Sequence, residues 1–202
     1  MPKNNKRDIE FLFEIGALRF MPRQWQRFLG PRFANITEHH FRVAWIALII
    51  ATHEGQTNTD KILKMALVHD IAESRTGDVD YIARQYVQRD EEQGIKDMLA
   101  HTLLHDEFVA LAAEYESHSS IEAQIVKDAD NLDVDLELRE QAVSGPILEA
   151  VFTEGRDRAM QKKLYTQTAK TMMQEIRKAN PHDWHALSPR NRLNGGDWKQ
   201  AK

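Results

Sequence analysis

A histidine and an aspartate stand side by side, His69 and Asp70, where a hydrophobic helical segment comes to its end. Adjacent helical side chains diverge by about 100°, yet near a helix terminus both can converge on one ion. Glu73 lies four residues after His69 and three after Asp70, so it shares their side of the helix. Taken alone, the pair is weak evidence, because a buried histidine bonded to a neighbouring aspartate is the commoner explanation.

Two more positions, distant in sequence, supply the same kinds of side chain. His39 lies in the first turn of an expected helix, and Asp130 lies in a much later one. The apolar positions that flank Asp130 are Ile125, Ala129, Leu132 and Leu136. They put its carboxylate at the border of the core, where a metal ion is one way to satisfy it. The alternative, which the spacing alone slightly favours, is a solvated acidic face made of Asp128, Asp130, Asp133 and Asp135.

The composition restricts which metal sites are possible. There is no cysteine, so thiolate sites, disulfides and cysteine nucleophiles are excluded, and 9 histidines with 31 acidic residues form the ligand pool. Imidazoles combined with carboxylates suit a divalent ion such as manganese, cobalt, iron, nickel or zinc, which can polarise a phosphoryl oxygen and activate water. A net charge of −4 argues against a nucleic acid polymer as partner.

We expect neither a targeting segment nor a membrane segment in this chain. Residues 1–20 read as an amphipathic helix rather than a signal peptide, so we expect a cytoplasmic protein. No apolar run approaches the roughly 18 residues of a membrane span, so no membrane partner is expected. With 202 residues and 42% hydrophobic content, we expect one domain over 1–202, its core over about 8–180 and a polar, loosely held tail over 181–202.

Apolar residues recur at helical spacing, and no stretch alternates with a period of two, so the predicted fold class is all-α. The expected helices are Asp8–Phe20, Thr37–Glu54, Thr59–Ile71, Val87–Tyr115, Ser120–Val143 and Arg156–Lys178. We expect Thr37 to cap the second helix, and Asp60 or Thr59 to cap the third. A loop rich in arginine and aromatic residues covers 22–36, and Gly77 marks a turn.

Three motifs, in order, resemble those of HD-domain phosphohydrolases. They are Thr37-Glu38-His39, then His69-Asp70 followed by Glu73 and Thr76-Gly77-Asp78, then Val126-Lys127-Asp128-Ala129-Asp130. Over roughly Asp8 to Val143 the sequence looks most like the bacterial 5′-deoxynucleotidase branch and its eukaryotic HD-domain relatives. The resemblance implies a single-domain HD-type helical bundle, a homodimer, and metal-dependent hydrolysis of the phosphate monoester of (deoxy)nucleoside 5′-monophosphates.

The resemblance also implies roles for particular residues. One divalent metal ion would be held by His39, His69, Asp70 and Asp130. Glu73 would be the catalytic carboxylate, which moves a proton to the leaving 5′-oxygen or from the attacking water. Proton transfer of this kind is worth typically about 10²–10⁴-fold in rate. Asp78 would be a second polar residue, at the sugar or at the attacking water.

The family has an arginine and a tryptophan close together before the first ligand, and Arg23 and Trp25 are assigned to these places. A guanidinium binds phosphate through two hydrogen bonds, and an indole can pack on a sugar or base. Arg19, Arg27 and Arg32 are alternatives for the phosphate contact. The pair could also be a surface arginine beside a core tryptophan.

Other histidines are weaker candidates. His101 and His105 have the spacing of zinc peptidase ligands, but Thr102 stands where the base glutamate is needed, which favours surface histidines. His182 and His185 fall in the polar tail. His40 points about 100° away from His39 and stays unassigned.

Other functions remain open from the sequence. The same metal core serves HD enzymes that act on nucleoside triphosphates, cyclic nucleotides or phosphometabolites; the compact domain and the Arg-Trp loop favour a monophosphate. A non-catalytic helical scaffold is the rival of another class. The retained set of histidines and acids argues against it.

Overall fold

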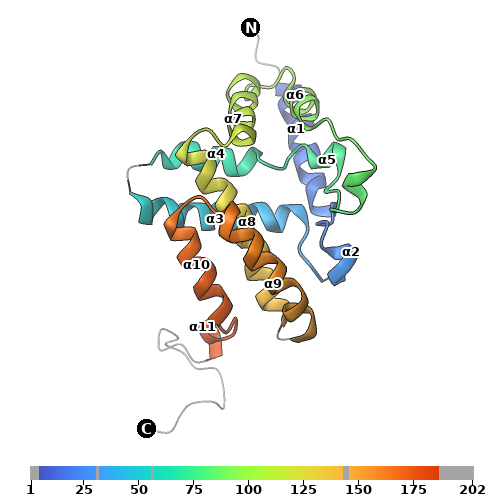
Figure 1. Ribbon diagram of the computed structural model, residues 1–202. Helices are drawn as coiled ribbons and strands as arrows, with labels where there is room; N and C mark the ends of the chain where they lie inside the picture. Colours follow the sequence, from blue (N-terminus) through green and yellow to red (C-terminus); the bar gives the residue numbers. More distant parts are fainter. Residues whose placement is uncertain (1–4, 31, 56, 143–145, 187–202) are drawn as a thin grey trace.

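The structure is a computed structural model that describes residues 5–30, 32–55, 57–142 and 146–186 (Figure 1). The regular elements in these ranges are helices, and one isolated β-bridge joins Pro22 to Asn35. The prediction of an all-α fold is confirmed. The helices are α1 Asn5–Ala17, η1 Leu18–Phe20, α2 Gln26–Leu29, α3 Ile36–Glu54, α4 Thr59–Val68, α5 Glu73–Thr76, η2 Ala83–Gln85, α6 Glu91–Leu99, α7 His105–Ser117, α8 Ile121–Ala142, α9 Pro146–Lys163, α10 Gln167–Lys178 and α11 Asp183–Ala186.

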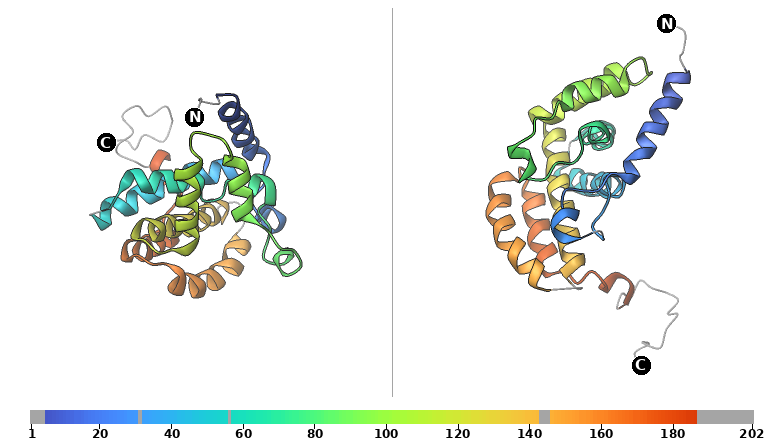
Figure 2. Two further views of the ribbon diagram at one scale, coloured as in Figure 1. Left: turned by 90° about the horizontal axis from the view of Figure 1, so that it is seen from above. Right: turned by 90° about the vertical axis from the view of Figure 1, so that its right-hand side faces the viewer.

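Helix α8 lies in the middle of the fold. It packs against α3, α4, α7, α9 and α10, while α1 lies at the edge beside α5 and α6 (Figures 1 and 2). The expected apolar faces are buried, including Val43, Ala47 and Ile50 of α3. Full burial of a valine or isoleucine side chain stabilises the fold by about 1.5–3 kcal/mol. None of the described helices is both long and apolar enough to cross a membrane.

The caps of α3 and α4 differ from those predicted. Asn35, not Thr37, caps α3, and Glu38 completes a capping box by accepting a hydrogen bond from the Asn35 amide. Asn58, rather than Asp60 or Thr59, caps α4. Asparagine ranks with the best N-caps, so each cap lies one or two residues earlier than expected. Helix α4 also ends at Val68, before the expected Ile71.

The prediction of a single helix over Val87–Tyr115 was wrong. Two helices, α6 and α7, cover this part of the chain, and they lie against each other. His101, between them, has a φ of 63°, a left-handed conformation that a continuous helix does not allow. His101 and His105 are therefore not on one helix face. His101 is exposed, which agrees with the prediction that it is a surface histidine.

The single helix expected over Arg156–Lys178 was also wrong, because α9 ends at Lys163 and α10 begins at Gln167. Thr166 caps α10 through the Ala169 amide. The buried carboxylate of Asp128 accepts hydrogen bonds from the Tyr165 and Thr166 amides and from the Thr166 hydroxyl. This carboxylate, distant in sequence, fixes the turn between the two helices.

The alternative interpretation of α8, a solvated acidic face, does not hold. Asp128, Asp133 and Asp135 are buried, and Asp135 is fully enclosed between Arg156 and Arg177. The predicted helix over Ser120–Val143 is confirmed as α8, Ile121–Ala142, while Val143 lies outside the described residues. In the predicted tail, Asp183–Ala186 form the short α11, and residues 187–202 lie outside the described part.

Candidate active site

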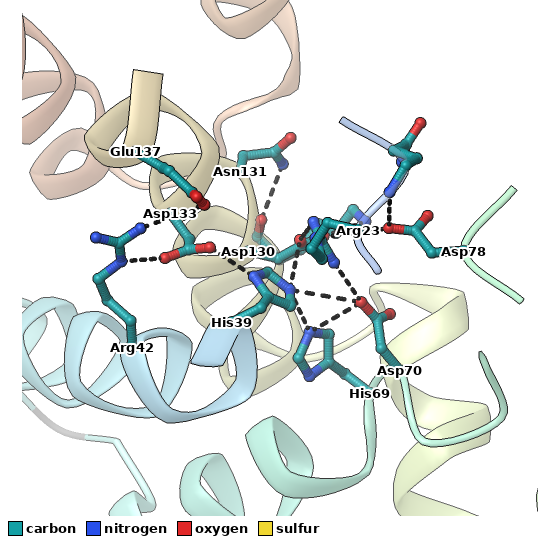
Figure 3. A network of polar contacts seen from close by, with 12 residues as sticks. Arg23, His39, Arg42, His69, Asp70, Asp78, Asp130, Asn131, Asp133 and Glu137 are labelled. Atoms are coloured by element: carbon teal, nitrogen blue, oxygen red, sulfur yellow. Dashed lines mark hydrogen bonds and ion pairs between the residues drawn. The ribbon is translucent and has the colours of Figure 1, made fainter. Parts of the chain in front are cut away.

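The start of α3 and the residues that follow α4 meet the middle of α8 (Figure 3). The capping box places His39 in the first turn of α3, His69 and Asp70 directly follow α4, and Asp130 comes from α8. One possible ligand atom from each of these four residues lies within 4.8 Å of the others. The structure thus brings together the four side chains that the resemblance implies as metal ligands.

Hydrogen bonds at the outer nitrogens orient both imidazole rings. His39 Nδ1 lies 2.6 Å from Asp133 Oδ2, and His69 Nδ1 lies 2.9 Å from the carbonyl oxygen of Ala66. Each Nδ1 therefore carries the proton, and each Nε2 presents its lone pair to the centre. The two Nε2 atoms are 3.2 Å apart, too close for two lone pairs without a cation or a proton between them.

This arrangement fits a divalent metal ion. Burial and the charge of Arg23 lower the pKa of His39, but hydrogen bonds to Asp130, Asp133 and Asp70 outweigh them and raise it to about 10. The carboxylates around His39 therefore favour a positive charge at this point, which a divalent ion would also supply. Nitrogen and oxygen donors at one buried point are the ligand set expected for a catalytic divalent ion.

The two oxygens of Asp130 have different partners. Oδ1 lies 3.4 Å from His39 Nε2, on the metal side. Oδ2 lies 2.8 Å from the Lys127 ammonium and 3.3 Å from the Tyr115 hydroxyl. Burial raises the pKa of Asp130, but the charge of Lys127 and the histidines hold it well below its usual value. The sequence analysis missed Lys127, although its i, i+3 spacing to Asp130 is a usable signal; nothing local pointed to Tyr115.

Glu73 lies beside the four-residue cluster and is buried. Burial, with the charges of Asp70 and Asp78, raises its pKa to about 10. Its Oε1 lies 3.6 Å from Arg89, and its Oε2 is buried with no hydrogen-bond partner among the described residues. A carboxylic acid with an unpaired buried oxygen is suited to give a proton to a reacting group.

Arg23 is the arginine of the 19–32 loop that reaches the cluster. It is buried, with Nη1 3.2 Å from Asp70 Oδ2 and Nη2 3.9 Å from Asp130 Oδ1. Arg27 instead pairs with Asp80 outside the cluster, and Arg19 lies over the ring of Phe20. The position of Arg23 therefore favours it over these alternatives.

Asp78 holds the loop that carries Arg23. Its Oδ2 accepts a hydrogen bond from the Gln24 amide at 2.9 Å and lies 3.5 Å from Arg23 Nε. Gly77 before it has a φ of 72°, the turn that the sequence predicted. These contacts indicate that Asp78 positions Arg23.

Trp25 is half-buried and lines the same groove as Asp70, Glu73 and Asp130. Its ring packs against Phe33 and Phe152, with centroids 6.4 and 6.0 Å apart. The groove has a volume of about 880 Å³, within the range of ligand sites. Basic side chains that line it are Arg23, Arg84, Arg89, Lys127, Arg156, Lys162 and Lys163.

The remaining histidines have other surroundings. His40 is buried with its ring 4.6 Å from that of His69, and burial, followed by the charge of His69, lowers its pKa. It packs behind the cluster. His182 and His185 are exposed and contact each other at 3.0 Å, on or beside α11.

The chain matches the HD domain family over residues 15–180, and it belongs to that family. The matched segment contains the four clustered residues and Glu73.

Named relatives share a large part of this segment. Human 5′-deoxynucleotidase HDDC2 is 33% identical over 138 residues, which make up 65% of this chain and 67% of that protein. The 5′-deoxynucleotidase ECA3034 of Pectobacterium atrosepticum is 30% identical over 150 residues, 67% of this chain and 74% of its own. The solved structure of a conserved hypothetical protein of Pyrococcus furiosus has a TM-score of 0.66 and 26% identity, and the match covers 85% of this chain and 99% of that one.

Proposed function

We propose that the chain hydrolyses the phosphate monoester of (deoxy)nucleoside 5′-monophosphates, with one divalent metal ion held by His39, His69, Asp70 and Asp130. Membership of the HD domain family and the 5′-deoxynucleotidase names of relatives at about 30% identity support this activity. The observation that carries it is the pair of imidazole Nε2 atoms, 3.2 Å apart and flanked by two carboxylates. Such a centre needs a cation to be stable.

A divalent ion at this centre supplies a Lewis acid that polarises the phosphoryl oxygens and lowers the pKa of bound water. Arg23 lies beside two of the proposed ligands, where its guanidinium can bind and orient the phosphate through two hydrogen bonds. Asp78 keeps Arg23 in that position. Glu73, protonated at neutral pH, gives its proton to the leaving 5′-oxygen.

Trp25 contacts the sugar in this proposal. It lines the groove beside the phosphate-binding residues, and Phe33 and Phe152 hold its ring in place. A rigid indole at this position can exclude a 2′-hydroxyl sterically, which favours deoxyribose.

The test is a phosphate-release screen on the purified chain. Nucleoside mono-, di- and triphosphates, cyclic nucleotides and sugar phosphates are compared, in ribo and deoxy forms, with manganese, cobalt, iron, nickel and zinc. We expect monophosphates to be hydrolysed fastest. Faster hydrolysis of triphosphates or cyclic nucleotides would mean that the enzyme acts on one of those substrate classes instead. Failure to take up any of the metals would favour the scaffold.

We also propose that two copies of the chain form a homodimer through α3. Phe41, Trp45 and Ile49 are spaced four residues apart and are 70%, 58% and 46% exposed, so they form one apolar strip on the outer face of α3. Light scattering after size-exclusion chromatography tests this, and Trp45→Lys should shift a dimer to monomer. The cytoplasmic location stays a prediction.

A further inference from the structure

Lys127 lies within the groove, one helical turn before Asp130. Its ammonium is 2.8 Å from Asp130 Oδ2 and 3.4 Å from the Tyr115 hydroxyl, and it lies 5.6 Å from the centre of the Tyr115 ring. These contacts hold one end of a flexible side chain in one place. The side chain is still 34% exposed, so it is accessible from the groove.

Lys127 and Arg23 lie near different oxygens of the same carboxylate, Asp130. Arg23 comes from the loop and contacts Asp70 and Asp130, whereas Lys127 comes from α8 and contacts the far oxygen of Asp130. Both cations line the groove. They are therefore placed to meet one ligand from two directions.

The charges indicate what that ligand is. A divalent ion between Asp70 and Asp130 neutralises both carboxylates. Arg23 and Lys127 then add two positive charges beside it, because Asp78, the other acid near Arg23, also has Arg84 at 3.9 Å. A phosphate monoester dianion carries the opposite charge. An ammonium has three donors, and Asp130 and Tyr115 leave Lys127 at least one for a phosphate oxygen.

We propose that Lys127 binds the substrate phosphate directly, opposite Arg23, as a second phosphate-recognition residue. The inference rests on the proposed phosphomonoester hydrolysis and extends it to a residue outside the ligand set. The rival explanation is that Lys127 only orients Asp130 for the metal. The two roles predict opposite changes in metal affinity, since an ammonium near the ion repels it, whereas an orienting partner strengthens its binding.

The experiment compares Lys127→Met, which removes the charge and keeps the length, with Lys127→Arg, which keeps the charge. Lys64→Met is the matched control, because Lys64 lies on α4 and pairs with Asp60 and Glu107 outside the groove. Manganese affinity of the full chain is measured by calorimetry. Binding of inorganic phosphate to the manganese-saturated chain is measured from the broadening of its ³¹P resonance, which also detects millimolar binding.

Lys127→Met should bind manganese at least as tightly as wild type and bind phosphate roughly 10- to 100-fold more weakly, the range for a hydrogen bond to a charged group. Lys127→Arg should keep most of the phosphate affinity, and Lys64→Met should match wild type. Phosphate affinity within threefold of wild type in Lys127→Met, or manganese affinity lowered more than tenfold, overturns the proposal. Hydrolysis of deoxynucleoside monophosphates by wild type is assayed separately. If wild type does not hydrolyse them, the proposed function fails, whereas the phosphate-binding measurement still tests the role of Lys127.

Discussion

The Nε2 atoms of His39 and His69 face each other at 3.2 Å, while their Nδ1 atoms are bound to Asp133 and to the Ala66 carbonyl. Neither ring can turn away without losing a buried hydrogen bond. In the metal-free chain, hydrogen bonds to the surrounding carboxylates raise the pKa of His39 to about 10, so His39 holds a proton that a metal ion would replace.

Metal binding should therefore release protons at pH 7.5. His39 must lose its proton to become a ligand, whereas Glu73, which is not a proposed ligand, should keep its proton as the general acid. Calorimetric titrations in buffers of different ionisation enthalpy count these protons. We expect about one per metal in both wild type and Glu73→Gln, because the released proton comes from His39. A count near zero in both would contradict the metal assignment of His39.

Two aspartates on α8 should separate metal binding from stability. Asp130→Ala should lose the metal, because it removes a ligand and its compensating charge, while the helix stays folded. Asp128→Asn should keep the metal but weaken the start of α10, since it changes a buried carboxylate that accepts three hydrogen bonds. We expect a loss of roughly 1–3 kcal/mol in unfolding free energy for Asp128→Asn. The metal content and the free energy of urea unfolding are measured for both variants. Wild-type metal content in Asp130→Ala would remove Asp130 from the ligand set.

Asp133 should control metal affinity without touching the metal. It accepts the His39 Nδ1 proton and is also bound by Arg42. Outer partners of metal-binding histidines are worth about 10–100-fold in affinity, so Asp133→Asn should weaken metal binding by that factor. Glu140→Gln is the control, because Glu140 is exposed and contacts only the far side of Arg42 in this network. Equal affinities in the two variants would show that His39 does not depend on Asp133.

Glu73→Ala should keep its metal and lose turnover. If Glu73 gives a proton in the transition state, kcat and kcat/KM should fall together by roughly 10²–10⁴-fold, with KM for the nucleotide little changed. Metal content, nucleotide affinity and phosphate release are measured on the same preparation. Loss of the metal would make Glu73 a ligand. Near-normal turnover would mean that another group, with Asp78 the next candidate, moves the proton.

Trp25→Ala should change the choice of sugar. Loss of the indole wall opens space beside the phosphate site, so the ratio of deoxy- to ribonucleotide kcat/KM should fall, whereas Trp25→Phe should keep part of it. Trp184→Ala, which changes a tryptophan that is 70% exposed on α11, is the control and should leave the ratio unchanged. A ratio unchanged in Trp25→Ala would place the sugar elsewhere.

Much of this protein is determined by short-range patterns in its sequence. The helical period of apolar residues gives the all-α class and the buried faces of α3 and α8, because side-chain direction along a helix depends only on local spacing. The ordered motifs at His39, His69-Asp70 and Asp130 identify the candidate ligands through their resemblance to the motifs of HD-domain phosphohydrolases. The clustered geometry agrees with those candidates.

Only the tertiary structure decided where helices break and which polar groups pair. Asp128 accepts hydrogen bonds from the turn between α9 and α10, although it lies 38 residues before Thr166 in the sequence. The periodic pattern over 156–178 therefore gave no sign that the helix is interrupted there. Asp133 reaches His39 across 94 residues, and what reads as an acidic face is a set of buried partners. Arg23 differs from Arg19 and Arg27 only in what the folded loop brings beside it. Burial and pairing depend on contacts between distant segments, and local spacing carries no record of them.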